Sequence, residues 1–145
     1  MMTRKDADED GFAFCLDETS EAAEIADFLG AAVARRFGPR DETPLSIVVR
    51  RSGATVAGLN GVSHWRWLYV RHFFVADDWR GQGLGRRLMS RAEAEARARG
   101  CIGIYLDTFE EGPARFYEKL GFERCGAIEN FPPGATRRYL RKSLS

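Results

Sequence analysis

The stretch DWRGQGLGRR, residues Asp78–Arg87, decides the fold of this chain. It follows a run of strand-forming residues and precedes a run rich in Ala and Arg, so it predicts a turn between a strand and a helix. Its three glycines let backbone N–H groups face a ligand without Cβ atoms in the way. The helix N-terminus adds partial positive charge, and Arg80, Arg86 and Arg87 add full charges around it. We therefore predict an anion-binding site here, with three solvated arginines on an ordinary turn as the alternative.

Two known phosphate-binding loops fit this turn less well. A Walker A loop is excluded because the sequence contains no Gly-Lys-Ser/Thr. A dinucleotide-binding G-x-G-x-x-G loop matches at Gly81 and Gly83, and Asp107 stands where its ribose-binding acid would lie. However, Arg86 replaces the third glycine, and the strands before the turn resemble an antiparallel meander rather than the parallel strands of that fold. NAD binding is kept only as an alternative.

Hydropathy patterns predict the elements around the turn. Three strands with short links come before it and predict an antiparallel meander, whereas the strand–helix–strand unit across the turn predicts a parallel crossover. We therefore expect an α/β domain with a mixed, mostly antiparallel central sheet, a parallel crossover at the glycine-rich turn and helices on both faces. The predicted strands are 11–17, 45–51, 55–59, 65–75, 101–106, 122–127 and 136–140. The first predicted helix ends near residue 37, and two further helices are predicted over 83–99 and 113–121.

Length and charge exclude several classes of protein. The 145 residues suit one domain, expected over 1–145 with residues 1–10 as a flexible tail. The 22 basic and 21 acidic side chains give a net charge of +1, which argues against a general nucleic-acid binder. No apolar run approaches the roughly 18 residues of a membrane helix, and the start lacks the apolar core of a secretory signal. We therefore expect a cytoplasmic protein that binds neither nucleic acid nor membrane.

The Cys and His residues predict no metal site. Cys15, Cys101 and Cys125 are odd in number and lack C-x-x-C spacing, so we interpret them as reduced, buried apolar residues. His64 and His72 form no H-E-x-x-H pattern and belong to no Cys/His cluster of the kind that holds structural zinc.

Two motifs resemble those of the GNAT acetyltransferase superfamily. The pattern Arg80-x-x-Gly83-x-Gly85 after a long strand is similar to the superfamily's pyrophosphate-binding signature. The stretch PARFYEKLGFE, Pro113–Glu123, resembles its later helix with a Tyr and a terminal Gly-Phe. The two blocks occur in the right order, separated by one helix and one strand, and the matched region covers about residues 67–127.

The resemblance implies acetyl-CoA as cosubstrate and no metal. It implies that backbone groups of one strand bind the pantetheine arm, and that an N–H near Phe74 or Val75 polarises the thioester carbonyl. It also implies that amides of the glycine turn hold the pyrophosphate and that Tyr117 stands near the thioester sulfur as general acid. The implied cofactor-binding residues are Phe73, Phe74, Val75, Arg80, Gly81, Gln82, Gly83, Leu84, Gly85, Arg86 and Tyr117.

The general base cannot be carried over from the resemblance. Many members have a carboxylate where Arg71 stands, Asn where Glu110 stands and Ala where Pro113 stands. Glu110 and Glu111 follow the carboxyl end of a strand, where ligands gather in open α/β sheets. They could deprotonate the amine, attract a cationic acceptor or be solvated loop acids. We take Glu110 as the candidate catalytic carboxylate beside Tyr117.

The acceptor is the least specified part of the expected reaction. The resemblance implies an N-acetyltransferase that moves acetyl directly from acetyl-CoA to a primary amine of a small molecule or peptide. Trp65, Trp67 and Tyr69 could line the acceptor cleft or belong to the core, which we favour for at least two of them. Arg71 could select an acceptor with a carboxylate, and His72 is interpreted as a packed or surface residue. The alternatives are a protein N-terminal or lysine acetyltransferase and a non-catalytic acyl-CoA-binding module. A homodimer through the last strands is a further expectation from the resemblance.

Overall fold

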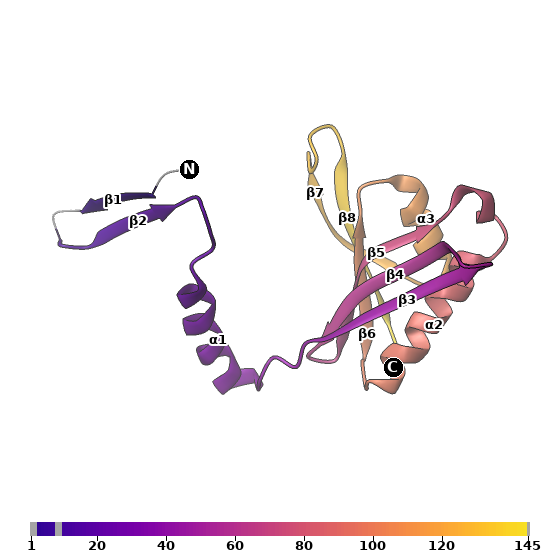
Figure 1. Cartoon of the computed structure of the whole chain (residues 1–145), viewed down its shortest axis with the longest axis horizontal. Coiled ribbons are helices and arrows are strands. Elements are labelled where there is room, and N and C mark those ends of the chain that lie inside the picture. Colours follow the sequence, from indigo (N-terminus) through magenta and orange to yellow (C-terminus); the bar gives the residue numbers. More distant parts are fainter. Residues whose placement is uncertain (1–2, 8–9, 145) are drawn as a thin grey trace. The chain divides into compact units, whose positions relative to one another are not determined.

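The computed structural model describes the backbone of Thr3–Ala7 and residues 10–144. The chain divides into two compact units, Met1–Arg40 and Asp41–Ser145, which we describe separately (Figure 1). Part of the expected flexible tail, residues 1–2 and 8–9, lies outside the described residues, and Thr3–Ala7 forms strand β1. None of the helices in the described part of the chain is long and apolar enough to cross a membrane.

The first unit contains a two-stranded hairpin and one helix. Strand β1 pairs antiparallel with β2 (Ala13–Asp17), and α1 (Ala23–Phe37) follows. The apolar residues of α1 recur at helical spacing, which accounts for the helix that the sequence predicts. Gly38 ends α1 with φ of +89°, and its N–H donates to the carbonyl of Ala34 at 2.9 Å.

The second unit is a six-stranded sheet in the order β3-β4-β5-β6-β8-β7 (Figure 1). Within the described residues, β5 and β6 are parallel and the other neighbouring strands are antiparallel, which confirms the predicted mixed sheet and its crossover. Strand β8 inserts between β6 and β7. The elements are β3 (Thr43–Arg51), β4 (Ala54–His64), β5 (Trp67–Val75), the short 3₁₀ helix η1 (Asp77–Trp79), α2 (Leu84–Ala98), β6 (Gly103–Thr108), α3 (Glu111–Lys119), β7 (Glu123–Glu129) and β8 (Thr136–Ser143).

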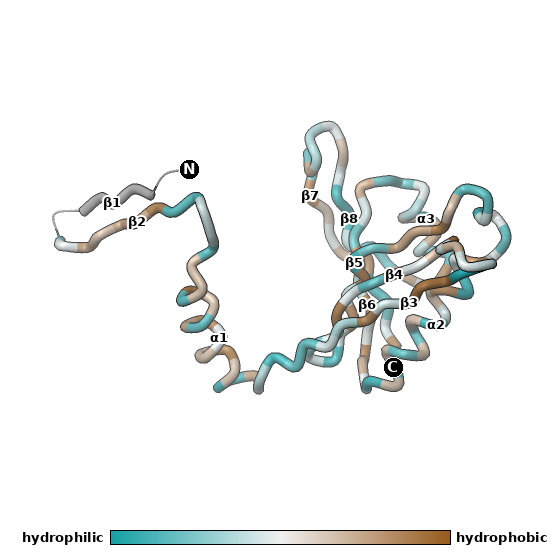
Figure 2. The backbone as a smooth tube through the Cα atoms, viewed as in Figure 1, coloured by the Kyte–Doolittle hydropathy of each residue, from teal (hydrophilic) through white to brown (hydrophobic). Residues whose placement is uncertain are grey.

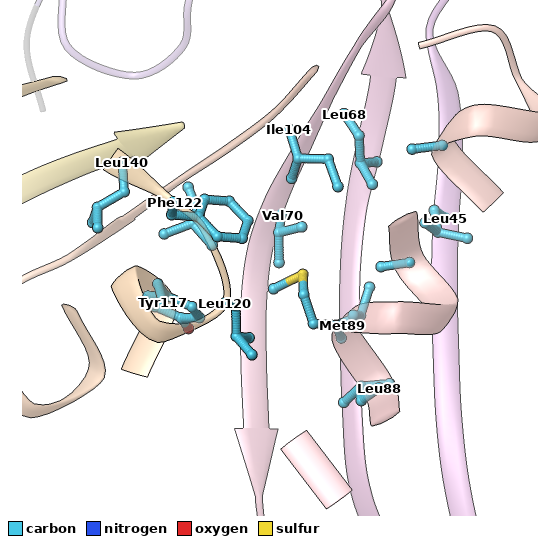
Figure 3. Close-up of a cluster of buried hydrophobic side chains, with 14 of the residues drawn as sticks. Leu45, Leu68, Val70, Leu88, Met89, Ile104, Tyr117, Leu120, Phe122 and Leu140 are labelled. Carbon is cyan, nitrogen blue, oxygen red and sulfur yellow. The ribbon is translucent and has the colours of Figure 1, made fainter. Parts of the chain in front are cut away.

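Within this unit, α2 and α3 pack on one face of the sheet. Alternate residues of each strand point to that face, and Leu68, Ile104 and Leu140 are fully buried there. Met89 of α2 and Leu120 of α3 belong to the same cluster (Figure 3). In Figure 2, brown apolar segments lie along β3 and β5, whereas β8 is mostly teal. Of the three cysteines, Cys101 is buried, but Cys15 and Cys125 are exposed, so the expectation that all three are buried is wrong.

The opposite face of the sheet carries aromatic residues. Tyr69 and Tyr105 stack with ring centroids 4.8 Å apart, and Trp67 meets Tyr105 edge-on at 6.4 Å. We call these three residues the aromatic wall; all three are half-buried. Trp65 lies in the β4–β5 turn and is 37% exposed. None of Trp65, Trp67 and Tyr69 belongs to the buried core, so the sequence interpretation of at least two as core residues is wrong.

Candidate active site

Strands β5 and β6 separate part of the way along their length. Their parallel pairing ends at Val70 and Leu106, whereas β5 stays paired with β4 as far as Val75. The register of β4 and β5 shifts opposite Arg71, and Gly61 faces this irregularity: a Cβ at Gly61 would lie 1.9 Å from the carbonyl oxygen of Tyr69. We call the divergence of β5 and β6 the fork. It leaves main-chain groups of β5 between 71 and 75 without strand partners on the β6 side.

The glycine-rich turn follows β5 directly. Gly81 and Gly83 have φ of +74° and +79°, a left-handed conformation that glycine adopts without strain. Gly83 is the N-cap of α2 and offers no side chain to its first turn, and no acidic residue lies there. The free N–H groups at the start of α2 and their partial positive charge are therefore available to an anion.

The three arginines of the turn differ in their surroundings. Arg80 is engaged, because its Nε donates to the Val75 carbonyl at 3.0 Å and its Nη1 lies 3.2 Å from Asp77. Arg86 lies in the first turn of α2 and makes no hydrogen bond or ion pair with the described residues, although the helix dipole disfavours a cation there. Arg87 does not line the same space and contributes to grooves beside β3. Of the three arginines predicted to surround the anion, only Arg80 and Arg86 line the same space beside the turn.

These elements enclose a cleft of about 600 Å³. Its volume falls in the range of ligand-binding sites. Ten of the eleven residues predicted to bind the cofactor line it, whereas Gln82 does not and bonds through its side-chain amide to the Asp78 carbonyl at 3.0 Å. The lining comprises Phe73, Phe74, Val75, Trp79, Arg80, Gly81, Gly83, Leu84, Gly85, Arg86, Glu110, Gly112, Pro113, Phe116 and Tyr117.

Helix α3 provides the wall that carries Tyr117. The ring of Tyr117 packs edge-on against Phe73 at 5.8 Å and beside Phe122 at 5.9 Å, so strand and helix side chains fix its orientation. Tyr117 is 7% exposed, and burial, with a smaller contribution from the Asp107 charge, raises its pKa to about 12. Its hydroxyl therefore keeps its proton at neutral pH, and it has no hydrogen-bond partner among the described residues.

The two neighbouring glutamates at the start of α3 behave differently. Glu110 is the N-cap of α3 and lines the cleft. Glu111 points to the β7–β8 side, where it bonds Arg124 at 2.6 Å and lies 3.1 Å from Arg138. These guanidinium groups, Arg124 first, hold the pKa of Glu111 below its usual range. Glu111 is therefore an ion-pair residue, and Glu110 is the carboxylate of this pair that faces the cleft.

A polar cluster at the fork was not predicted. Asp107 is the first residue of β6 after its last pairing with β5, and its side chain is 10% exposed. Its Oδ1 accepts a hydrogen bond from the Tyr69 hydroxyl at 2.7 Å, and its Oδ2 accepts one from Arg137 Nη1 at 2.6 Å. The sequence motifs indicated Asp107 only as a ribose-binding acid, and no motif included Arg137. The signal that could have found Asp107 is its position at a strand's carboxyl end beside a switch in strand direction.

The remaining polar residues near the fork are exposed. Arg71 lies over the ring of Tyr69 at 5.7 Å and makes no hydrogen bond or ion pair with the described residues. His72 Nδ1 lies 2.8 Å from Asn60 Oδ1 on the surface, as the interpretation of a packed or surface histidine expects. In the part of the chain that the structure describes, no group of three or more His, Cys, Asp or Glu residues could hold a metal ion.

Comparisons with known proteins agree with this geometry. The sequence model of the acetyltransferase (GNAT) domain matches residues 43–124. An acetyltransferase of Agrobacterium fabrum is 39% identical over 127 residues, which is 87% of this chain and 92% of that protein. A blasticidin-S acetyltransferase of Streptomyces morookaense is 41% identical over 93 residues, covering 63% of this chain and 68% of its own. The crystal structure of an Agrobacterium tumefaciens protein described as an acetyltransferase superimposes with a TM-score of 0.79 at 36% identity and covers 90% of this chain and 98% of its own.

The family match contains the fork, the glycine turn and α3, which together form the cleft. The motif-based resemblance and the fold expected from it are confirmed. The chain belongs to the GNAT family of acetyltransferases.

Proposed function

We propose that this protein transfers an acetyl group directly from acetyl-CoA to a primary amine of a small molecule or peptide. The observation that carries the proposal is the cleft of about 600 Å³, in which the open half of β5, the glycine turn and Tyr117 meet. An elongated ligand with an anionic end and an acyl end fits this arrangement, because the anion site lies at one part of the cleft and a proton donor at another.

The glycine turn binds the pyrophosphate in this proposal. The backbone amides from Gly81 to Arg86 are the donors, and the uncompensated charge of Arg86 adds electrostatic attraction. The strand stretch from Phe73 to Val75 supplies main-chain groups to the pantetheine arm, apart from the Val75 carbonyl that Arg80 already bonds; the arm contains amide groups that can pair with them. Gln82 takes part only through its backbone.

The transfer step uses two groups of the chain. A backbone N–H near Phe74 or Val75 stabilises the negative charge that develops on the thioester oxygen when the amine attacks. The C–N bond forms, the C–S bond breaks, and the hydroxyl of Tyr117 donates its proton to the departing sulfur. The pKa of about 12 keeps Tyr117 protonated and ready to donate at neutral pH. Glu110 removes a proton from the amine, directly or through water, because its carboxylate lines the same cleft.

The acceptor binds at the face of the sheet that carries the aromatic wall in this proposal. Arg71, exposed and without an ion-pair partner among the described residues, selects an acceptor that carries a carboxylate. The name of the Streptomyces relative indicates a small-molecule acceptor for that protein. We propose that the acceptor of this chain is also a small amine. We further propose one acetyltransferase domain over 1–145, because the 127 residues matched to the Agrobacterium fabrum protein exceed the second unit and include part of the first.

Two assignments about the protein's setting are also proposals. A homodimer through β7 is supported by the position of β7 at the sheet edge, where its outer main-chain groups lack a strand partner among the described residues. A cytoplasmic location is supported by three free cysteines, which persist in reducing compartments.

Thiol release with a panel of amines tests the proposed activity. Purified protein, acetyl-CoA and each of tyramine, L-tyrosine, tyrosinamide, spermidine, blasticidin S and a lysine-containing peptide are mixed, and free CoA thiol is measured. We expect release with at least one small amine, and L-tyrosine to be preferred over tyrosinamide if Arg71 selects a carboxylate. Release with the lysine peptide alone would support protein acetylation. Binding of CoA without release from any amine would support the non-catalytic acyl-CoA-binding module.

A further inference from the structure

Asp107 has a position and a set of partners that the proposed reaction does not yet use. We propose that its carboxylate holds the acceptor's ammonium group at the fork, so that the acceptor is a primary amine that arrives protonated. This inference rests on the proposed function, because it assigns a residue to the amine of the same reaction.

Asp107 lies on the face of the sheet opposite α2 and α3, next to a residue of the buried core. Leu106, its neighbour on β6, points to the helix-covered core, whereas Asp107 points to the opposite face and bonds Tyr69 there. The fork begins at Asp107, so no β5 residue pairs with it. After burial, its charge also contributes to the raised pKa of Tyr117. A cation held at Asp107 therefore lies where the pairing of β5 and β6 ends.

The carboxylate of Asp107 is fixed but not saturated. It accepts one hydrogen bond on each oxygen, from Tyr69 and from Arg137, whereas a carboxylate offers about four acceptor sites. Arg137 is itself positioned over the rings of Phe131 at 4.1 Å and Phe109 at 5.5 Å. Free acceptor sites on a positioned carboxylate allow an ammonium group to bind without displacing the existing donors.

The Asp107–Arg137 pair is poorly arranged as a purely stabilising ion pair. A bidentate pair would use two nitrogens of the guanidinium, but only Nη1 of Arg137 bonds Asp107. The buried Nε of Arg137 has no hydrogen-bond partner among the described residues. A buried polar atom left without a partner costs stability, so optimised ion pairing does not account for this geometry.

The aromatic wall beside Asp107 favours a cation as well. Tyr69 and Tyr105 present stacked rings next to the carboxylate, and Trp67 extends the wall along the same face. The guanidinium of Arg71 already lies over the ring of Tyr69 at 5.7 Å, so the wall is a surface that attracts cations. The ammonium is thus the end of the acceptor that the face recognises, while its flat or extended remainder lies along the wall.

Asp107 keeps its charge in the transfer step. The acceptor nitrogen loses one proton to Glu110 or water, attacks the thioester carbon and loses a second proton as the C–N bond forms. Tyr117 gives its proton to the sulfur and regains, through water, that second proton from the attacking nitrogen. The sum is one amide, one thiol and one proton released to solvent. Asp107 attracts and orients the nitrogen before these steps.

Kinetics of Asp107→Asn test this role. The variant removes the charge and keeps the shape of the side chain. At saturating acetyl-CoA, with tyramine as the first probe and then the best amine of the panel, we expect the KM for the amine to rise about 10- to 100-fold, the loss of one charge-assisted interaction. The dissociation constant for acetyl-CoA, measured by calorimetry, should stay within about two-fold. Glu123→Gln, which removes an exposed carboxylate paired with Arg141 at 2.9 Å, is the matched control and should leave both constants unchanged.

Asp107→Glu keeps the inference testable if the Asn variant does not fold. It keeps the charge but moves it by one methylene, so we expect a smaller rise in the amine KM. An active wild-type protein with an unchanged amine KM in Asp107→Asn, or in Asp107→Glu if only that variant folds, would overturn the inference and leave the proposed function intact. A wild-type protein that binds acetyl-CoA but acetylates no amine would overturn the proposed function and, with it, this role for Asp107.

Discussion

The two faces of the six-stranded sheet are built from alternate residues of the same strands, but they differ in kind. On the helix-covered face, Leu68, Ile104 and Leu140 are fully buried among other apolar side chains. On the opposite face, their neighbours include Tyr69, Tyr105 and Asp107, which are half-buried and joined by stacking and hydrogen bonds. The apolar face holds the domain together, and the polar face offers groups that a ligand can use.

The faces meet at the fork, and this is where the site forms. Tyr117 comes from α3 on the helix-covered side, and Asp107 lies on the other face where the pairing of β5 and β6 ends. A continuous sheet would keep the two groups apart. In the proposed reaction, the interrupted pairing of β5 and β6, rather than either face alone, provides the place where the thioester and the amine meet.

The largest expected effect is on stability and separates the faces directly. Ile104→Ala removes a fully buried side chain, and we expect the free energy of unfolding to fall by about 2–5 kcal/mol. The adjacent Tyr105→Leu replaces a half-buried side chain and should cost about 1–2 kcal/mol, mainly the ring contacts with Tyr69 and Trp67. Urea unfolding followed by circular dichroism measures both. Equal losses would contradict the distinction between the face that packs against α2 and α3 and the aromatic face.

The next effect concerns Tyr117, which is buried and is also the proposed general acid. Tyr117→Phe keeps the packing against Phe73 and Phe122 but removes the proton donor. We expect kcat to fall about 100-fold, within the usual contribution of a general acid. Acetyl-CoA binding, measured by calorimetry on the same sample, serves as the control and should not change. Full turnover of the variant with unchanged binding would rule out the acid role.

The strands, the helices and the glycine turn were predictable because their signals are local. Alternation and glycine placement lie within a few residues, so the strand before the turn and the helix after it were expected near their observed ends. Strand β4 is longer than expected, because Gly58 and Gly61 are part of it and Gly61 faces the irregularity in β5. Arg86 and Arg87 diverge because successive residues of a helix point about 100° apart.

The Asp107–Arg137 pair was not predictable from local patterns. The two residues lie 30 positions apart, and they meet because β8 pairs with β6 rather than lying outside β7. Alternation along each strand predicts which residues share a face, but it does not give the order of strands in the sheet. The residues that a ligand touches therefore depend on the part of the fold that the sequence specifies least directly.

A smaller effect is expected at high pH. Burial raises the pKa of Tyr117 from 10.0 to about 12, so between these values the unfolded chain gives up the proton while the folded chain keeps it. The contribution of the buried Tyr117 hydroxyl to the free energy of unfolding is therefore fully present below about pH 10. It falls as the pH rises toward the pKa of Tyr117 in the folded chain, by about 1 kcal/mol between roughly pH 9 and pH 11. Denaturant titrations at both pH values measure it. Tyr117→Phe should lose less stability than the wild type over this interval, and an identical loss would contradict the burial argument.

The smallest expected effect is on the polar face. Tyr69→Phe removes the hydrogen bond to Asp107 but leaves the ring and the pairing with Arg137. We expect about a three-fold rise in the KM for the amine, as for the loss of a modest hydrogen bond, and no change in acetyl-CoA binding. Steady-state kinetics at saturating acetyl-CoA measure it. A rise as large as that of Asp107→Asn would show that the hydroxyl of Tyr69, rather than the carboxylate, contacts the amine.

Calorimetric titration with acetyl-CoA tests most directly whether the cleft holds this thioester. The wild type should bind one molecule per chain with a dissociation constant on the order of micromolar, typical of substrate affinities. Gly83→Val places a β-branched residue at φ of +79° and should weaken binding at least about 10-fold, whereas Gly126→Ala, with no atom within 4 Å of its new Cβ, should bind as the wild type does. No heat of binding from the wild type at millimolar acetyl-CoA, or equal affinity in Gly83→Val, would contradict the account.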